Sequence, residues 1–161
     1  WMIDQAFCVS ITTFVGQNFG AGKPDRIKKG IAEVIAMETV LAVITGLIVV
    51  NAAPVLLSLF TTSKSVIAIG RLISHDIAPF YWTFICSEIL SSALRAENYV
   101  MVTTVTNLLG ICLFRIIWVH FVASSGIVSL LYCYPISYVI TSTLVLLYFL
   151  YRQPKISKKL R

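Results

Sequence analysis

The chain has 161 residues, of which 58% are hydrophobic and only 12% are charged, and its formal net charge is +6. A soluble domain carries about 25% charged residues, so this chain has too little polar surface to cover a core in water, which excludes a soluble globular protein. A nucleic-acid-binding protein is also excluded, because the basic residues cluster at the edges of apolar runs, where membrane topology puts them, and not on one helix face.

Five apolar segments separated by short polar breaks are predicted to be membrane-spanning helices, at residues 1–19, 27–60, 66–94, 99–122 and 127–151. A bilayer core about 30 Å thick needs about 20 helical residues. Pro54 and Pro79 are expected to kink or end the helices that contain them. The chain begins inside apolar sequence, and we expect the natural N-terminus to lie upstream of Trp1.

The distribution of Lys and Arg predicts the orientation in the membrane. These residues concentrate in the first break, at Arg95 in the third break, and in a basic tail at residues 152–161. If the spans alternate, all three regions lie on one side, and only Lys64 and the nearby Arg71 lie opposite. The positive-inside rule then predicts a multi-pass protein of the cell (plasma) membrane with a cytoplasmic C-terminal tail.

The first break holds the most distinctive motif of the chain. Its sequence is GQNFGAGKPDR, residues 16–26. The glycines predict a tight turn, and Pro24 followed by Asp25 predicts the start of the next helix. No GxxxxGK[ST] phosphate loop is present, so the sequence gives no sign of ATP coupling within this chain.

This motif resembles the turn between the second and third helices of each six-helix half of a MATE (multidrug and toxic compound extrusion) transporter, and its form is more similar to that of the C-terminal half. The motif residues are Gly16, Gln17, Asn18, Gly20, Ala21, Gly22 and Arg26. Three later pieces are similar in the same order: APVLLSLF at 53–60, SALR at 92–95 and LGICLFRIIW at 109–118.

The resemblance implies an all-α integral membrane protein in which this chain is a five-helix fragment of a six-helix lobe, helices eight to twelve of twelve. One departure is that Arg95-Ala96-Glu97-Asn98 stands where the family has Arg-Gly-x-Gly. We expect Asn98 to take the left-handed turn conformation in place of glycine.

Three acids are candidates for coupling transport to an ion. A carboxylate inside a helix bundle is costly, so it needs a functional or structural reason. Glu88 is the first candidate, Glu38 the second and Asp4 the third, and the alternative for Glu88 is a structural hydrogen bond to a neighbouring helix, for instance to Arg115. We expect Arg115 itself to be structural and to pair with a carboxylate or with carbonyls at a helix end.

Other kinds of site receive little support. The four cysteines lie inside apolar runs without metal-binding or disulfide spacing, so we expect no metal or other cofactor beyond a coupling proton or sodium ion. The tryptophans and tyrosines either line a cavity for flat organic cations or form interfacial belts. A membrane enzyme is disfavoured, because the only histidines, His75 and His120, lie towards the outer side.

The sequence and the resemblance together predict a secondary active transporter. It would be an antiporter that exports drugs or toxic organic cations in exchange for protons or sodium. Its expected partners are the organic cation or drug substrate, the lipid bilayer and the missing N-terminal lobe of the same transporter, without which it is incomplete. Two alternatives stay open: a lipid-linked sugar flippase of the same superfamily, and a membrane subunit that does not transport.

Overall fold

The computed structural model describes residues 2–122 and 126–160, and the side chains of residues 79, 127–128 and 154–160 lie outside this description. Within the described residues the chain forms helices and no β-strand. The predicted all-α fold is therefore confirmed. Trp1, the predicted turn at Ser124 and Ser125, and the tail residue Arg161 fall outside the described residues.

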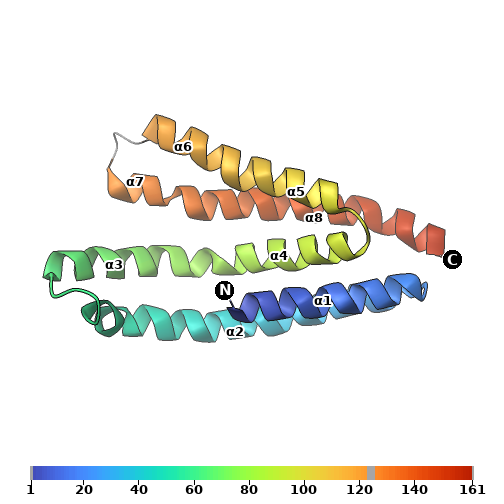
Figure 1. The fold of residues 1–161 in the computed structure, drawn as a ribbon, viewed down its shortest axis with the longest axis horizontal. Helices are drawn as coiled ribbons and strands as arrows, with labels where there is room; N and C mark the ends of the chain where they lie inside the picture. Colours follow the sequence, from blue (N-terminus) through green and yellow to red (C-terminus); the bar gives the residue numbers. More distant parts are fainter. Residues whose placement is uncertain (1, 123–125, 161) are drawn as a thin grey trace.

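The helices follow one another along the chain with short connections. They are α1 (Met2–Gly20), α2 (Pro24–Ser58), α3 (Lys64–Ile77), η1 (Ala78–Phe80), α4 (Tyr81–Ala96), α5 (Val100–Asn107), η2 (Leu108–Leu113), α6 (Phe114–Val122), α7 (Ile127–Leu131) and α8 (Cys133–Leu160). η1 is a 3-10 helix and η2 is a π-helix that joins α5 to α6. Figure 1 shows these elements as an elongated bundle of roughly parallel rods.

The connections alternate between the two ends of the bundle. The α1–α2 turn, the α4–α5 turn and the C-terminal end of α8 lie at one end, and the α2–α3 connection lies at the other (Figure 1). The three basic regions of the sequence thus share one end, which we call the basic end.

Three helices in the described residues are long and apolar enough to cross a membrane: Pro24–Ser58, Val100–Val122 and Ser129–Gln153. α3 and α4 together make a fourth candidate, bent by 55° at η1. The bend confirms the kink expected at Pro79, since proline has no backbone N–H to continue the helical hydrogen bonds. Pro54 lies inside α2, which ends four residues later at Ser58. The fifth predicted span, α1, stays a prediction.

α4 is the centre of the packed core. Its residues Ile85, Ile89, Leu90, Ala93 and Leu94 are buried against side chains of α1, α2 and α8. Ser91 and Ser92 are fully buried on the same helix. Small side chains allow helices to approach closely in membranes, so this part of α4 suits a position between neighbouring helices.

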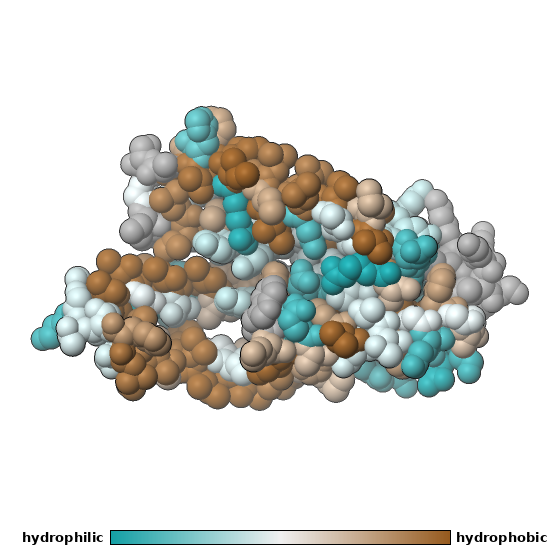
Figure 2. Space-filling model, viewed as in Figure 1, coloured by the Kyte–Doolittle hydropathy of each residue, from teal (hydrophilic) through white to brown (hydrophobic). Residues whose placement is uncertain are grey.

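The outward faces of the bundle are apolar. Figure 2 shows hydrophobic side chains over most of the visible face, with hydrophilic ones gathered towards the basic end. On α2 the exposed apolar side chains include Met37, Val40, Val43, Ile44, Leu47 and Ile48. A surface of this kind is unusual in a soluble monomer and suits contact with lipid.

Two turns at the basic end close their helices in the same way. After α1, Gly22 has a φ of +66°, the Lys23 N–H donates to the Asn18 carbonyl at 2.9 Å, and the Gly22 N–H donates to the Phe19 carbonyl at 3.1 Å. This pattern is the Schellman motif, in which a left-handed residue lets the last carbonyls of a helix find donors. An added Cβ would meet nothing at Gly16 or Gly20.

The turn after α4 repeats this pattern with asparagine in the left-handed position. Asn98 has a φ of +71°, the Tyr99 N–H donates to the Leu94 carbonyl at 2.9 Å, and the Asn98 N–H donates to the Arg95 carbonyl at 3.0 Å. The conformation expected of Asn98 is confirmed. Asparagine adopts this conformation more readily than most residues with a side chain.

A buried ion pair fastens α8 to this second turn. Arg152 Nη1 donates to Glu97 Oε2 at 2.5 Å, and the side chains are only 8% and 1% exposed. The Arg152 guanidinium also lies over the ring of Tyr99. Burial raises the pKa of the Glu97 carboxyl, and the Arg152 charge and hydrogen bond offset part of that shift. Arg152 is thus part of a packed contact, and α8 continues as a helix to Leu160.

Substitutions at Asn98 test the turn. Asn98→Val should lower the free energy of unfolding by about 1–2 kcal/mol, because a β-branched residue is strained at positive φ. Asn98→Gly should preserve stability, since glycine adopts this conformation freely. Unfolding of the full polypeptide that carries this chain, followed in detergent micelles, measures both variants. Equal stability of the valine and glycine variants would contradict the left-handed assignment.

Substitutions at Arg152 test the buried pair. Arg152→Ala should destabilise the folded protein by roughly 3–5 kcal/mol, because it leaves the Glu97 carboxylate buried without a partner. The double variant Glu97→Leu/Arg152→Met should recover most of that loss. The same micelle unfolding experiment measures these variants, with the exposed cation variant Lys28→Ala as the control. A loss for Arg152→Ala no larger than for Lys28→Ala would rule out the buried pair.

Candidate functional site

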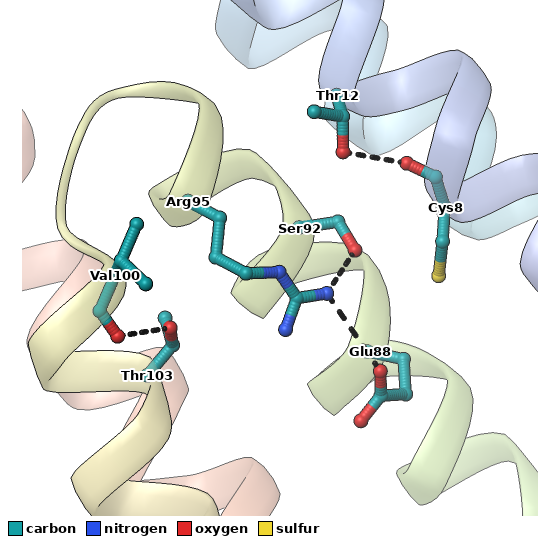
Figure 3. Close-up of polar contacts among 7 residues, drawn as sticks. All are labelled: Cys8, Thr12, Glu88, Ser92, Arg95, Val100 and Thr103. Carbon is teal, nitrogen blue, oxygen red and sulfur yellow. Dashed lines mark hydrogen bonds and ion pairs between the residues drawn. The ribbon is translucent and has the colours of Figure 1, made fainter.

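Glu88, the first candidate acid, is half-buried on α4 and faces a cation from its own helix. Arg95 Nη2 lies 3.9 Å from Glu88 Oε2, and Arg95 also donates to the Ser92 hydroxyl at 2.7 Å. Figure 3 shows the Arg95 side chain folded back along α4 towards Glu88. The sequence had offered Arg115 as a structural partner for Glu88, and this is wrong, because Glu88 contacts Arg95 two turns further along the same face of α4, while Arg115 contacts α8.

Glu38 and Asp4 lie together deeper in the bundle. Both line one cavity of about 400 Å³ between α1, α2, η1 and α4. Glu38 is 2% exposed and Asp4 is 8% exposed. Neither oxygen of Asp4, nor Oε2 of Glu38, has a hydrogen-bond donor among the described residues. Two acids predicted from separate segments of sequence thus share a cavity, and no cation of the described residues pairs with either of them.

Glu88 lies on the third helix of this group. α4, which carries Glu88, packs against α1, which carries Asp4, and against α2, which carries Glu38. Three helices, α1, α2 and α4, therefore bring the three candidate acids into one region of the lobe. At about 1.5 Å per residue, Glu88 is roughly 12 Å from the basic end of α4, and Glu38 lies further along the bundle.

Cys8 lies among these acids and was missed as part of the site. It is buried on α1, one helical turn after Asp4. In Figure 3 it lies across from the side of α4 that carries Ser92 and Glu88. The sequence offered no signal for this position, because a lone cysteine in an apolar run is typical of a small buried residue.

The partners of Arg115 among the described side chains are neutral groups. Its Nε donates to the Ser137 hydroxyl at 3.1 Å, and its guanidinium carbon lies 4.4 Å from the ring centre of Tyr134 and 5.3 Å from that of Tyr138. We expected a carboxylate or helix-end carbonyls as its partners, and this is wrong. The π-helical turn η2 precedes α6, and both elements contact α8.

The glycine-rich motif lies at the basic end, away from the acids. Gly16, Gln17, Gly20 and Ala21 belong to the end of α1 and its cap, and Gly22 supplies the left-handed residue. Asn18 is buried and its amide donates to the Phe14 carbonyl at 2.8 Å. Arg26 is exposed in the first turn of α2. The motif therefore joins two helices, as predicted, and its contacts shape the connection.

The aromatic residues fall into more than one environment. Trp82 is 52% exposed and borders an open groove between α2, α4 and α8. Trp118 donates from its ring nitrogen to the Ser129 carbonyl and so ties α6 to α7. Tyr138 packs against Tyr81 and Phe84. These positions favour neither the cavity nor the interfacial belt for the set as a whole.

In the described residues no three His, Cys, Asp or Glu side chains are grouped closely enough to hold a metal ion. The arrangement offers carboxyl groups in an apolar bundle and a paired arginine. Such a site suits binding and release of a small cation.

Comparison with known proteins identifies the family. No curated protein and no solved structure matches the chain. The sequence model of the MatE family matches residues 1–121, which include α1 to α5, η2 and most of α6. MatE proteins are membrane transporters and not enzymes, and the apolar helices agree with a multi-pass membrane protein. The chain therefore belongs to the MatE family of membrane transporters.

Proposed function

We propose that this chain is part of an antiporter that exports drugs or toxic organic cations in exchange for protons or sodium. It would form helices eight to twelve of twelve, in the C-terminal lobe, and work with an N-terminal lobe of the same polypeptide in the plasma membrane. Family membership and the form of the glycine-rich turn support this proposal. The observation that carries it is the pair Asp4 and Glu38, buried together without a cation.

The physical reason is the cost of charge in an apolar bundle. An isolated ionised carboxylate is strongly disfavoured away from water, and two close carboxylates repel one another. Asp4 and Glu38 meet both conditions and have no basic partner in the described residues. A shared proton or a bound sodium ion would relieve both costs, and release of that ion would make the lobe favour a different arrangement.

Glu88 would bind the ion on its way between this pair and the cytoplasm. It lies nearer the basic end than Glu38 and already has Arg95 as an alternative partner. When Glu88 carries no ion, Arg95 can neutralise it, and when an ion arrives the Arg95 side chain can remain on Ser92. Ion arrival and departure would thus change a contact near the cytoplasmic turn of α4.

Substrate export would follow from rocking of the two lobes around a cavity between them. The ion would favour one arrangement and the organic cation the other, so that each displaces its counterpart. Exposed aromatic side chains such as Trp82 and Tyr81 suit contact with a flat cation through their ring faces. The C-terminal end of α8 would lie in the cytoplasm with the two basic turns.

Neutralising the acids tests this proposal. In the full polypeptide, Glu88→Gln, Glu38→Gln and Asp4→Asn should each abolish export of ethidium driven by an imposed proton or sodium gradient, because each removes a charge needed to hold the ion. Export from proteoliposomes, with inserted protein quantified, is the measurement. The matched control is Glu33→Gln, since Glu33 is exposed on the same helix as Glu38 and pairs with Lys29; its export should remain at the wild-type level.

The outcomes separate the alternatives. Wild-type export by Glu88→Gln at matched insertion would remove Glu88 from the mechanism. Absence of ethidium export by the wild type, together with gradient-dependent movement of a lipid-linked sugar, would favour a flippase. If no variant changes function or stability, a subunit that does not transport is the better description.

A further inference from the structure

We propose that Arg115, flanked by Tyr134 and Tyr138, binds the phosphate of a lipid headgroup from the leaflet opposite the basic end. This site is separate from the acid cluster and does not depend on the proposed ion coupling. It rests on the partners of Arg115, on the donors it keeps free, and on its depth in the bundle.

The chain offers no carboxylate for Arg115. It has seven acidic side chains, and all seven lie within the described residues. Three pair with other cations: Glu88 with Arg95, Glu97 with Arg152 and Glu33 with Lys29. Asp76 contacts the ring of the neighbouring His75. Asp4 and Glu38 share their own cavity, and Asp25 is exposed in the first turn of α2 at the basic end. Arg95 and Arg152 have acid partners, whereas Arg115 does not.

The neighbours of Arg115 orient its guanidinium without neutralising it. The Ser137 hydroxyl accepts from Nε and donates in turn to the Tyr134 carbonyl at 2.9 Å. The rings of Tyr134 and Tyr138 attract the cation through their faces, with the guanidinium carbon 4.4 Å and 5.3 Å from the two ring centres. The positive charge is therefore held in place and left available to an anion.

The free N–H donors of Arg115 are arranged so that they can bind a phosphate. Arginine carries five N–H donors in a planar fork, and Ser137 occupies only the one on Nε. The fork matches phosphate oxygens in a bidentate manner. Ser137 is fully buried while Tyr134 is 38% exposed, so the site has a closed floor and an open side.

The depth of Arg115 suits a lipid headgroup. At about 1.5 Å per residue, it lies roughly 10 Å from the last residue of α6. Long basic side chains extend along a helix to reach the membrane interface. The nearest interface is the one opposite the basic end, where Figure 1 shows the end of α6. A free phosphate in water would offer the same chemistry, and the experiment separates the two sources.

Lipid binding to the full polypeptide tests the site. The protein is purified in a neutral detergent and titrated with phosphatidylglycerol or with monogalactosyldiacylglycerol, which has no phosphate, and bound lipids are counted by native mass spectrometry. Arg115→Gln should weaken binding of one phosphatidylglycerol by about tenfold or more, because it removes a charge-assisted hydrogen bond to the phosphate. Binding of the galactolipid should be unchanged.

Arg71→Gln is the matched control, because it removes the same charge from an exposed site in α3 near the same end of the bundle. It should bind phosphatidylglycerol as the wild type does. If Arg115→Gln does not insert, Arg115→Lys keeps the charge without the fork and should show a smaller loss. Identical lipid binding by wild type and Arg115 variants would overturn the site, as would binding of inorganic phosphate at Arg115 without binding of phospholipid.

Discussion

Charge inside hydrocarbon is costly, and the described part of the chain is arranged around that cost. Glu97 and Arg152 are buried together at the end of α4 and α8, so that neither is left alone. Glu88 lies within reach of Arg95 on its own helix. Asp4 and Glu38 are buried, and none of the cations in residues 2–122 and 126–160 with described side chains pairs with them. Arg115 is held by neutral groups. The paired charges hold the fold together, and the unpaired ones are where an ion or a ligand has most to gain.

α4 connects these features because it is both the centre of the core and the carrier of Glu88 and Arg95. Its serines keep it close to its neighbours, and its apolar residues pack against α1, α2 and α8. The Schellman turn at Asn98 ends it beside Tyr99, over which Arg152 lies. If Arg95 released Glu88, the conformation of the turn that anchors α8 would therefore change as well. This gives a physical route from ion binding to movement at the basic end.

Much of the fold follows from local sequence, because apolar length, proline and turn chemistry act over a few residues. The bend at Pro79 and the left-handed Asn98 were both predicted on those grounds, and the family was predicted from motifs in order. Pairings between distant segments were not. Glu97 and Arg152 are 55 residues apart, and from the sequence Arg152 was assigned to the basic tail. The choice of Ser137 for Arg115 depends on how α6 and α8 are rotated about their axes, which packing decides. The contact between Glu88 and Arg95 is local to α4, and it was missed because the two residues are two full turns apart. The candidate acids were named from sequence, but their convergence needed the bundle.

Whether Asp4 and Glu38 hold an ion between them is tested most directly by their reactivity in the membrane. Dicyclohexylcarbodiimide partitions into hydrocarbon and modifies carboxyl groups that carry a proton. The full polypeptide is treated in native membranes, and its modified peptides are mapped by mass spectrometry. We expect adducts on Asp4 or Glu38, reduced when sodium is added or the pH is raised, and none on the exposed Glu33. Adducts confined to exposed acids such as Glu33 and Asp25, with Asp4 and Glu38 unmodified under every condition, would contradict a shared ion in this cavity.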